Sequence, residues 1–408
     1  MRPKLIWDVA AKEILSTVRD QRAIISNLVL PLILLPVMML GMPLLLGGLF
    51  ERETVSVTEV AFQSGDELPA ALQSAIESRN VALVAVADPE AAVRDGDYPV
   101  GLVIPAGFAA AVSQGEHASV SLLSKTGNMR SELNASKLQE ALGAYQQEVV
   151  AQRLGAAGLD PTILQPVEVK HVDASSAAER SSGQLSWLIP FFIAIWTLTG
   201  GQMTAIDATA GEKERGTLES LLVAPVRRSE VVAGKAIATM VFGLTAAIAA
   251  IVGYLLGGIA MRSIFMPRLG DEAESMVSIM GGSLAVDVGS ILLLLISAVL
   301  LAAVVAALLI GIGMFARSFK EAQSYVAPLS FLFVIPAVGL QFKDLIGLGD
   351  SAYYVPVFNA LLVMDDIVKG TATVPHMLMT WGSLLVVIFL LLLFAYRNFT
   401  REDVIFRS

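Results

Sequence analysis

Residues 288–316 read VGSILLLLISAVLLAAVVAALLIGIGMFA, which is 29 residues without one Asp, Glu, Lys or Arg. About 20 apolar residues cross the hydrocarbon core of a bilayer as a helix, so this run is long enough to span it. Five other uncharged runs share this property, and they cover residues 23–50, 181–206, 236–261, 322–342 and 370–396. Six such runs in one chain predict an α-helical polytopic membrane protein with six transmembrane helices.

The overall composition agrees with this prediction. The chain has 408 residues, of which 55% are hydrophobic and only 16% are charged, whereas soluble domains carry about 25% charged residues. The net charge of −9 argues against a nucleic-acid partner. There are no cysteines, so disulfides, thiolate zinc sites and cysteine nucleophiles are excluded.

The distribution of Lys and Arg predicts how the chain crosses the membrane. Residues 1–22, 207–235, 317–321 and 397–408 together carry 15 Lys and Arg, whereas the short loops 262–287 and 343–369 carry only four. Cytoplasmic loops are enriched in these residues, so both termini are expected in the cytoplasm, with 397–408 as a cytoplasmic tail. The same orientation places the long segment 51–180 outside.

Segment 51–180 is predicted to form an extracytoplasmic α/β domain between the first and second spans. It holds 18 Asp and Glu and 9 Lys and Arg in 130 residues, which is too polar for lipid. Extended runs alternate with helical ones, which is typical of helices packed on a small sheet. The expected strands are 55–62, 81–87, 100–104, 118–123 and 167–172, and the expected helices are 66–78, 89–94, 106–114 and 130–154. The strand order stays open.

Residues 1–22 are predicted to form an amphipathic helix at the cytoplasmic face of the membrane. Trp7, Ala10, Ile14 and Val18 recur at helical spacing. Charged residues lie on the other side, so the segment can rest at the interface before the first span begins.

The sequence offers no catalytic constellation. Residues 211–217 have the glycine spacing of a phosphate loop but lack the lysine that would reach the phosphates. His117, His171 and His376 are scattered without metal-ligand spacing. We therefore expect no catalytic residue, metal site or cofactor on this chain, and no enzyme activity of its own.

The cytoplasmic stretch 211–235 reads GEKERGTLESLLVAPVRRSEVVAGK. Leu218, Leu221 and Leu222 would line one side of a short helix that Pro225 ends. Charged side chains cluster around its start: Glu212, Glu214, Arg215 and Glu219. An amphipathic helix with a charged rim predicts a docking surface, whereas an ordinary solvated loop would not need the leucine face.

This stretch resembles the signature of type-2 ABC exporter permeases, in which Glu-x-Glu-x-Gly-Thr-x-Glu is followed by a Pro and a Gly-Lys. The matching positions are Glu212, Glu214, Gly216, Thr217, Glu219, Pro225, Gly234 and Lys235. The resemblance implies a coupling helix that fits a groove on a separate ATPase subunit. It assigns this coupling role to Glu212, Glu214, Arg215, Gly216, Thr217, Leu218, Glu219, Leu221, Leu222 and Pro225.

The resemblance also implies the assembly. Two copies of this permease would pair with two ATPase subunits, which hold ATP and Mg, in the cell membrane of a bacterium or archaeon. ATP hydrolysis on the partner would drive alternating access in the permease.

A second segment, Tyr354-Val-Pro-Val-Phe-Asn359, is similar to the Pro-x-x-Asn segment of NatB-type sodium-efflux permeases. That resemblance implies Na⁺ efflux and a re-entrant outer loop at 343–369. The candidate residues for an outer gate or ion path are Pro356, Asn359, Asp365, Asp366, Gln202 and Asp207.

Two other functions stay open at this point. The same machinery could export a drug, a lipid or another amphiphile or peptide, since the spans contain few polar residues. A sensor with an outer ligand-binding domain is a different class, but it predicts a cytoplasmic output domain. The longest cytoplasmic piece, 207–235, has only 29 residues.

Overall fold

The structure is a computed structural model that describes residues 2–38, 40–41, 56–164, 176, 179, 186–217, 225–265 and 287–399. The chain divides into two compact units, each described here by itself. The helical unit comprises Met1–Pro43 and Ala174–Ser408, and the α/β unit comprises Leu44–Asp173.

The described residues contain six helices that are long and apolar enough to cross a membrane. They are Gln21–Met38, Leu188–Glu214, Arg228–Ile264, Val288–Gly313, Phe319–Phe342 and Val374–Asn398. These six helices, with a small α/β sheet after the first, confirm the predicted fold class.

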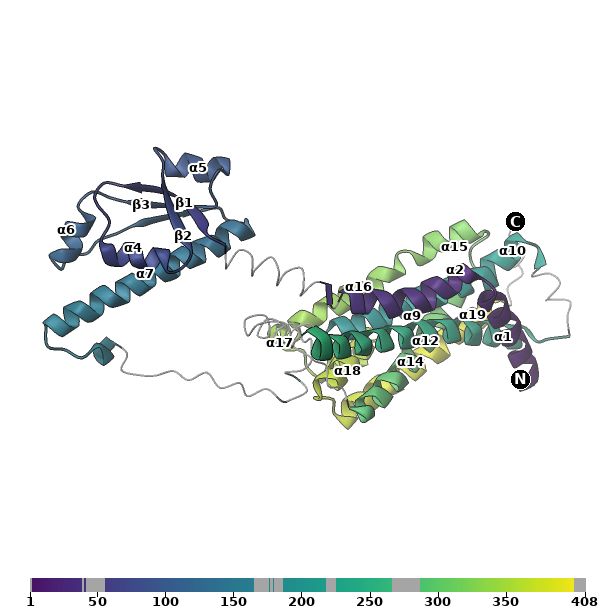
Figure 1. The fold of residues 1–408 in the computed structure, drawn as a ribbon. Coiled ribbons are helices and arrows are strands. Elements are labelled where there is room, and N and C mark those ends of the chain that lie inside the picture. Colours follow the sequence, from purple (N-terminus) through teal and green to yellow (C-terminus); the bar gives the residue numbers. More distant parts are fainter. Residues whose placement is uncertain are drawn as a thin grey trace. The chain divides into compact units, whose positions relative to one another are not determined.

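The helical unit is built from the following elements (Figure 1). A separate helix, α1 (Pro3–Val18), precedes the first span, which opens with α2 (Gln21–Ile24) and the π-helical turn η1 (Ile25–Val29). The second span joins α9 (Leu188–Ile206), η3 (Asp207–Gly211) and α10 (Glu212–Glu214). The others are α12 (Arg228–Ala260) with η4 (Met261–Phe265), α14 (Val288–Gly313), α15 (Phe319–Val326) with α16 (Leu329–Gly339) and η6 (Leu340–Phe342), and α19 (Val374–Phe399).

Short helices lie between the last two spans, in the segment 343–369 for which the resemblance implied a re-entrant loop. They are α17 (Lys343–Ile346), η7 (Asp350–Tyr354) and α18 (Phe358–Lys369). Every residue of α18 from Asn359 to Val368 is buried. Helix α18 is thus an internal element of the unit.

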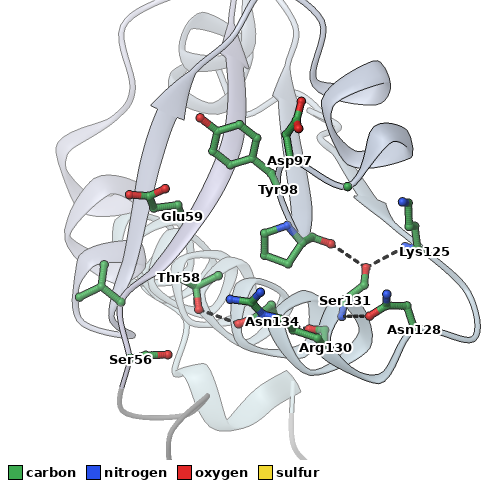
Figure 2. Close-up of a pocket in the computed structure, with 13 residues that line it drawn as sticks. Ser56, Thr58, Glu59, Asp97, Tyr98, Lys125, Asn128, Arg130, Ser131 and Asn134 are labelled. Carbon is green, nitrogen blue, oxygen red and sulfur yellow. Dashed lines mark hydrogen bonds between the residues drawn. The ribbon is translucent and has the colours of Figure 1, made fainter.

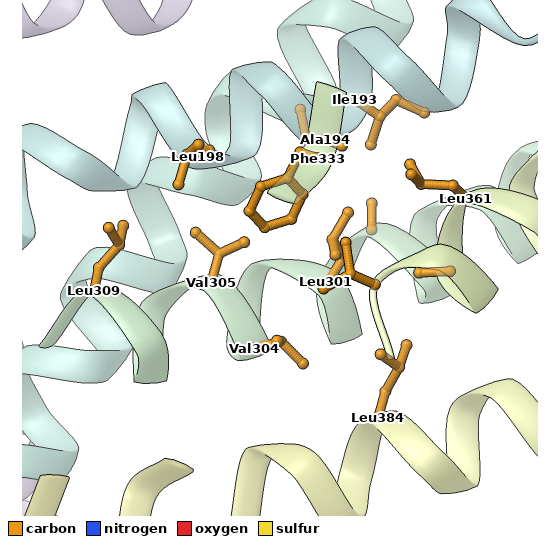
Figure 3. Close-up of a cluster of buried hydrophobic side chains, with 14 of the residues drawn as sticks. Ile193, Ala194, Leu198, Leu301, Val304, Val305, Leu309, Phe333, Leu361 and Leu384 are labelled. Atoms are coloured by element: carbon orange, nitrogen blue, oxygen red, sulfur yellow. The ribbon is translucent and has the colours of Figure 1, made fainter. Parts of the chain in front are cut away.

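The core of the helical unit lies among α9, α14, α16, α18 and α19. Phe333 of α16 is fully buried beside Ala194 of α9 and Val305 of α14 (Figure 3). Leu361 of α18 and Leu384 of α19 belong to the same cluster. Because this core includes α18, the buried helix is held by the spans themselves.

Glycines bring α9 and α12 into backbone contact. A methyl group at Gly200 would lie 2.6 Å from Cβ of Ala246 and 2.9 Å from the carbonyl oxygen of Phe242. Small residues of this kind let membrane helices approach closely. Asn27 of the first span donates from Nδ2 to the carbonyl oxygen of Gly200 at 3.2 Å, so three spans meet at this glycine.

The α/β unit contains one four-stranded sheet in the order β2-β1-β3-β4. Its strands are β1 (Thr58–Ser64), β2 (Val81–Ala85), β3 (Val100–Ile104) and β4 (Ser121–Ser124). Strand β1 pairs in parallel with β2 and β3, and β4 pairs antiparallel with β3. The predicted first four strands are confirmed, whereas the one predicted at 167–172 lies outside the described residues.

Helices cover both faces of this sheet (Figure 1). They are α4 (Ala70–Glu77), α5 (Pro89–Asp95), α6 (Phe108–Ser113) and α7 (Met129–Ala156), followed by η2 (Pro161–Leu164). Leu102 of β3 packs in one cluster with Leu72 of α4 and Leu138 of α7. The neighbouring Gly101 faces Val93 of α5, because alternate strand residues point to opposite faces.

A polar cavity of about 340 Å³ opens where β1, β3 and β4 meet the start of α7 (Figure 2). Ser131 donates its hydroxyl to the carbonyl oxygen of Pro99 at 2.7 Å and accepts from the backbone N–H of Lys125 at 2.8 Å. Asn134 accepts from the hydroxyl of Thr58 at 2.6 Å. These bonds fix the first turns of α7 against the sheet.

The close approach at Gly200 gives a testable consequence. Gly200→Val should lower the free energy of unfolding by about 1–3 kcal/mol, because the new side chain overlaps Ala246 and the Phe242 carbonyl. Unfolding of the purified protein in mixed micelles, titrated with SDS, measures this change. Gly382→Ala in α19 is the control, since nothing lies within 4 Å of its new methyl group. Equal stability of the two variants would contradict close α9–α12 packing.

Candidate functional site

The structure describes six of the ten predicted coupling residues. Glu212, Glu214, Arg215, Gly216 and Thr217 lie at the end of the second span, and Pro225 lies just before α12. The predicted leucine face and one acid, Leu218, Glu219, Leu221 and Leu222, lie outside the described residues.

The sequence predicted that the second span ends at Ile206, because Asp207 is the first charged residue after it. The structure differs from this prediction. The helix continues through η3 and α10 to Glu214. The charges along this extension have partners: Arg215 Nη1 bonds Asp207 Oδ1 at 2.9 Å. Gly216, with φ of 69°, ends the helix in the left-handed conformation that glycine adopts without strain.

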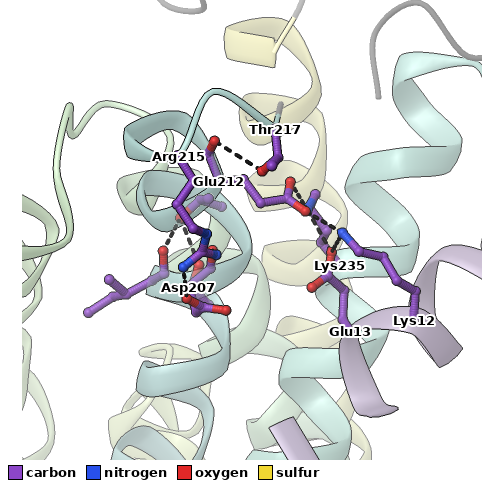
Figure 4. Close-up of polar contacts among 10 residues, drawn as sticks. Lys12, Glu13, Asp207, Glu212, Arg215, Thr217 and Lys235 are labelled. Atoms are coloured by element: carbon purple, nitrogen blue, oxygen red, sulfur yellow. Dashed lines mark hydrogen bonds and ion pairs between the residues drawn. The ribbon is translucent and has the colours of Figure 1, made fainter. Parts of the chain in front are cut away.

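A group of four charged side chains joins three segments, and we call it the inner ion cluster: Lys12, Glu13, Glu212 and Lys235 (Figure 4). The Nζ atom of Lys235 lies 2.6 Å from Oε2 of Glu212 and 2.8 Å from Oε1 of Glu13. Lys12 contacts both carboxylates as well. The cluster therefore connects α1, the end of the second span and the start of the third.

Burial makes these pairs costly to break. The side chain of Lys235 is 1% exposed, and those of Glu13 and Glu212 are each 5% exposed. Removing one partner of a buried ion pair leaves an uncompensated charge, which costs about 3–5 kcal/mol. The two lysines and two glutamates balance, so the intact cluster carries no net charge.

Lys12, at the exposed edge of the inner ion cluster, stays charged at physiological pH. Burial lowers its pKa, but the hydrogen bond to Glu212 and the charges of Glu13 and Glu212 more than offset this and raise the pKa above its ordinary value. A lysine with a raised pKa stabilises the fold below its unfolded-state pKa. This contribution is lost only as the pH rises through the raised value, on the alkaline side.

Helix α1 packs on α12 through one side, whereas Trp7 belongs to the apolar side predicted to face the membrane. Its buried residues are Val9, Ala10 and Glu13, whereas Trp7 is 60% exposed. A methyl group at Gly234 would lie 2.7 Å from Cβ of Val9, so the two helices touch. Glu13 was not predicted as a site residue. Its only sequence signal is that this acid follows the apolar Ala10 by three residues.

Arg2 ties the start of α1 to the same region. Its Nη2 lies 3.0 Å from Oε2 of the buried Glu230 and 2.8 Å from the carbonyl oxygen of Pro225. Pro225, expected to stop the coupling helix, thus also receives a bond from α1. This second link makes the contact between α1 and residues 225–235 continuous.

The end of the second span also contacts the turn between the fourth and fifth spans. Glu214 Oε2 accepts from the backbone N–H of Phe319 at 2.7 Å. Lys213 Nζ donates to the carbonyl oxygen of Met314 at 2.8 Å. Thr217 donates its hydroxyl to the carbonyl oxygen of Glu212 at 3.3 Å and closes the turn. Residues 212–217 therefore lie where α1 and four spans meet.

The predicted gate and ion-path residues do not form one group. Ser186, just before α9, bonds Asp365 Oδ1 at 3.0 Å, whereas Asp207 follows the other end of α9. The 19 residues of α9 rise about 28 Å. Asp207 and the half-buried Gln202 therefore lie near residues 212–217, and Asp365 lies at the opposite end of α9.

Asp365 and Asp366 are held by lysines, and we call these four residues the outer ion cluster: Lys343, Asp365, Asp366 and Lys369. Lys343 Nζ lies 2.6 Å from Asp365 Oδ2 and 2.8 Å from Asp366 Oδ1, and Lys369 lies 3.0 Å from Asp365. Burial lowers the pKa of Lys343, but the two carboxylates outweigh it and raise that pKa. Both carboxylates are thus paired with lysine ammonium groups.

Pro356 lies in the break between η7 and α18, and Asn359 lies in the first turn of α18. Pro356 is exposed, whereas Asn359 is fully buried and donates from Nδ2 to the carbonyl oxygen of Tyr353 at 2.9 Å. Asn359 is therefore part of the packing between the short helices and α19.

Disrupting the inner ion cluster tests its contribution. Lys235→Met should lower the free energy of unfolding by about 3–5 kcal/mol, because Glu13 and Glu212 lose their buried partner. Adding Glu212→Gln should recover part of that loss, since one uncompensated charge disappears. SDS titration in mixed micelles measures both changes.

The control variant is Arg215→Met, which removes a cation from the same segment. Its pair with Asp207 is 54% and 40% exposed, so the expected loss is only about 0–1 kcal/mol. A Lys235→Met variant that is no less stable than Arg215→Met would contradict the inner ion cluster.

Comparison with known proteins places this architecture in a family. Residues 22–397 match the family described as ABC-2 family transporter protein. A relative from Bacillus subtilis (strain 168), described as ABC transporter permease protein NatB, is 28% identical over 403 residues, which cover 98% of each chain. The match covers the described spans except for Gln21 and Asn398, and it includes residues 212–235. The chain therefore belongs to the ABC-2 family of transporter permeases.

Proposed function

We propose that this chain is the non-catalytic permease subunit of an exporter that moves Na⁺ out of the cell, driven by a separate ATPase. ABC permeases work with ATPase subunits. The observation that supports the coupling role is the position of residues 212–217, which bond to α1, to α12 and to the turn before α15.

In this proposal, residues 211–225 receive the movement of the ATPase. The leucines of this stretch would fill a groove on the partner, and its acids would form pairs at the rim. A displacement of Glu212 pulls on Lys235 and Glu13 at once, because a buried ion pair resists separation. The movement of the ATPase would thus be transmitted to α1 and to the third span together with the second span.

The complete transporter would contain two permeases and two ATPase subunits. ATP and Mg would be held by the ATPase subunits and contribute no group to this chain. Both termini and residues 207–235 would lie in the cytoplasm of a bacterial or archaeal cell, and the α/β unit outside.

Sodium as the cargo is supported by resemblance. Residues 354–359 are similar to the Pro-x-x-Asn segment of NatB-type sodium-efflux permeases, and the relative from Bacillus subtilis carries the NatB name. Neutral oxygens of broken membrane helices are ligands that Na⁺ accepts in transporters.

One observation favours the alternative of an amphiphile as cargo. An apolar cavity of about 460 Å³ lies between the start of α12 and the end of α19. It is lined mainly by Val232, Ala233, Phe389, Leu392 and Leu393, with Ser229 and Tyr396. Such walls would suit a lipid tail or a lipophilic drug, so both cargoes belong in one assay.

Transport by vesicles that contain the permease and its ATPase tests the function. ATP should drive Na⁺ across the membrane, and a lipophilic dye should not compete. Leu221→Ala should weaken ATPase binding by about 30-fold, the change that corresponds to about 2 kcal/mol for a buried leucine anchor. Glu214→Lys with Glu219→Lys should leave ATP hydrolysis without export.

Glu140→Lys, a charge reversal on an exposed side chain of the α/β unit, is the matched control and should leave transport unchanged. Full ATPase binding and full transport in both coupling variants would refute the coupling role. Dye export without Na⁺ export would replace sodium by the amphiphile.

Thiol labelling tests the orientation in the membrane. The chain has no cysteine, so each introduced thiol is unique. A cysteine at the exposed Ser113 should react with an impermeant maleimide in intact cells. One at the exposed Lys320 should react only after permeabilisation. The opposite labelling pattern would invert the topology.

A further inference from the structure

Two buried oxygen atoms at the contact of α18 and α19 have no hydrogen-bond partner among the described residues. They are Oδ1 of Asn359 and Oγ1 of Thr380, and both residues are 0% exposed. Leaving a buried polar atom unpaired costs free energy, so such an atom commonly marks the place of a bound water or ion.

The two residues belong to one polar group, in which Ser383 is the link. Asn359 Nδ2 donates to the hydroxyl of Ser383, which donates to the carbonyl oxygen of Thr380 at 2.9 Å. The orientation of the Asn359 amide follows from its other bond, to the carbonyl oxygen of Tyr353 at 2.9 Å. If the amide oxygen and nitrogen of Asn359 were exchanged, Oδ1 would lie against the carbonyl oxygen of Tyr353. Oδ1 is therefore the atom without a partner.

The threonines of the spans fall into two groups. Thr204, Thr239 and Thr380 have buried hydroxyls without a hydrogen-bond partner among the described residues. Thr197, Thr209 and Thr245 each donate to the carbonyl oxygen four residues earlier, at 2.6–2.7 Å. Thr380 makes no such bond among the described residues. Its oxygen therefore stays available, and an amide oxygen lies in the same polar group.

The backbone beside Asn359 is strained. Val357 has φ of 71° and ψ of −54°, a region that β-branched residues avoid. The backbone N–H of Asn359 donates to the carbonyl oxygen of Val355 at 2.9 Å and holds this turn closed. Backbone strain of this kind concentrates at ligand sites, where surrounding contacts maintain it.

We propose that Asn359 Oδ1, Thr380 Oγ1 and Ser383 Oγ form a binding site for a dehydrated monovalent cation, which in the export cycle is Na⁺. This assignment rests on the proposed function. Neutral amide and hydroxyl oxygens suit an alkali cation, and here they come from the first turn of α18 and from the facing part of α19.

The charges nearby set the selectivity and strength of this site. Divalent cations prefer carboxylates, and Asp365 and Asp366 are already held by Lys343 and Lys369. The amino end of α18 disfavours a cation. The site therefore binds weakly, as release of a transported ion requires.

Thermal unfolding of the purified full-length permease in lipid nanodiscs tests the site. The midpoint temperature is measured in NaCl, KCl and N-methylglucamine chloride at equal ionic strength, and then titrated with NaCl. A ligand that binds only the folded state raises the midpoint in a saturable manner. Wild type should show this rise with NaCl, and the rise should be smaller with KCl and absent with N-methylglucamine.

Single substitutions separate the ligand role from packing. Thr380→Val keeps the shape of the side chain and should raise the half-saturating NaCl concentration by about tenfold. Asn359→Ala should do the same, and Asn359→Asp should lower that concentration by adding a charged ligand. Thr197→Val is the matched control: it removes a buried hydroxyl that is bonded within its own helix, and its response should equal that of wild type.

The outcomes separate the site from the export function. A wild type without a sodium-dependent midpoint, or a Thr380→Val variant that responds like wild type, overturns the site. An equal response to KCl overturns sodium as its ligand. A sodium response that Thr380→Val weakens, in vesicles that do not export Na⁺, supports the site and overturns the proposed cargo.

Discussion

A charge that enters the helical unit must bring a counter-charge with it, and much of this structure depends on that constraint. The desolvation of a lone buried charge is too costly to tolerate, whereas a balanced, hydrogen-bonded group is acceptable. Lys235 is 1% exposed and sits between Glu13 and Glu212. The requirement to pair this lysine brings α1, α10 and α12 to one point.

The same rule operates at the other end of the spans. In the outer ion cluster, two lysines neutralise two aspartates and tie α18 to α17, and Ser186 adds a bond from the start of α9. The two clusters thus hold the two ends of α9. Between them lie the apolar core and close glycine contacts, as at Gly200 against Ala246.

The chain belongs to the ABC-2 family of permeases, and its spans pack closely between the two ion clusters. Close glycine contacts and a core packed around Phe333 hold α9, α12, α14 and α16 together. The break before α18 is the exception. Strain at Val357 and an unpaired oxygen at Asn359 occur where α18 begins, and the unpaired oxygen of Thr380 lies in the neighbouring α19.

The sequence by itself determined the architecture. Six uncharged runs of 21–29 residues predicted the spans, because hydrocarbon thickness fixes helix length. Alternating extended and helical runs likewise predicted the α/β unit, since the period of the apolar residues distinguishes strand from helix. The signature at 212–235 indicated the family, which the family match over residues 22–397 confirms, and it predicted a coupling region.

Only the tertiary structure decided which charges meet. Glu13 and Lys235 are 222 positions apart, and Lys343 and Asp366 are 23 apart, so no local pattern could pair them. Asp207 and Asp365 were both candidates for the outer gate or ion path. In the structure they lie at opposite ends of α9. Periodicity reports only the local environment of each residue. A buried ion pair depends on where separate helices cross, and these crossings are set by the packing of the whole unit.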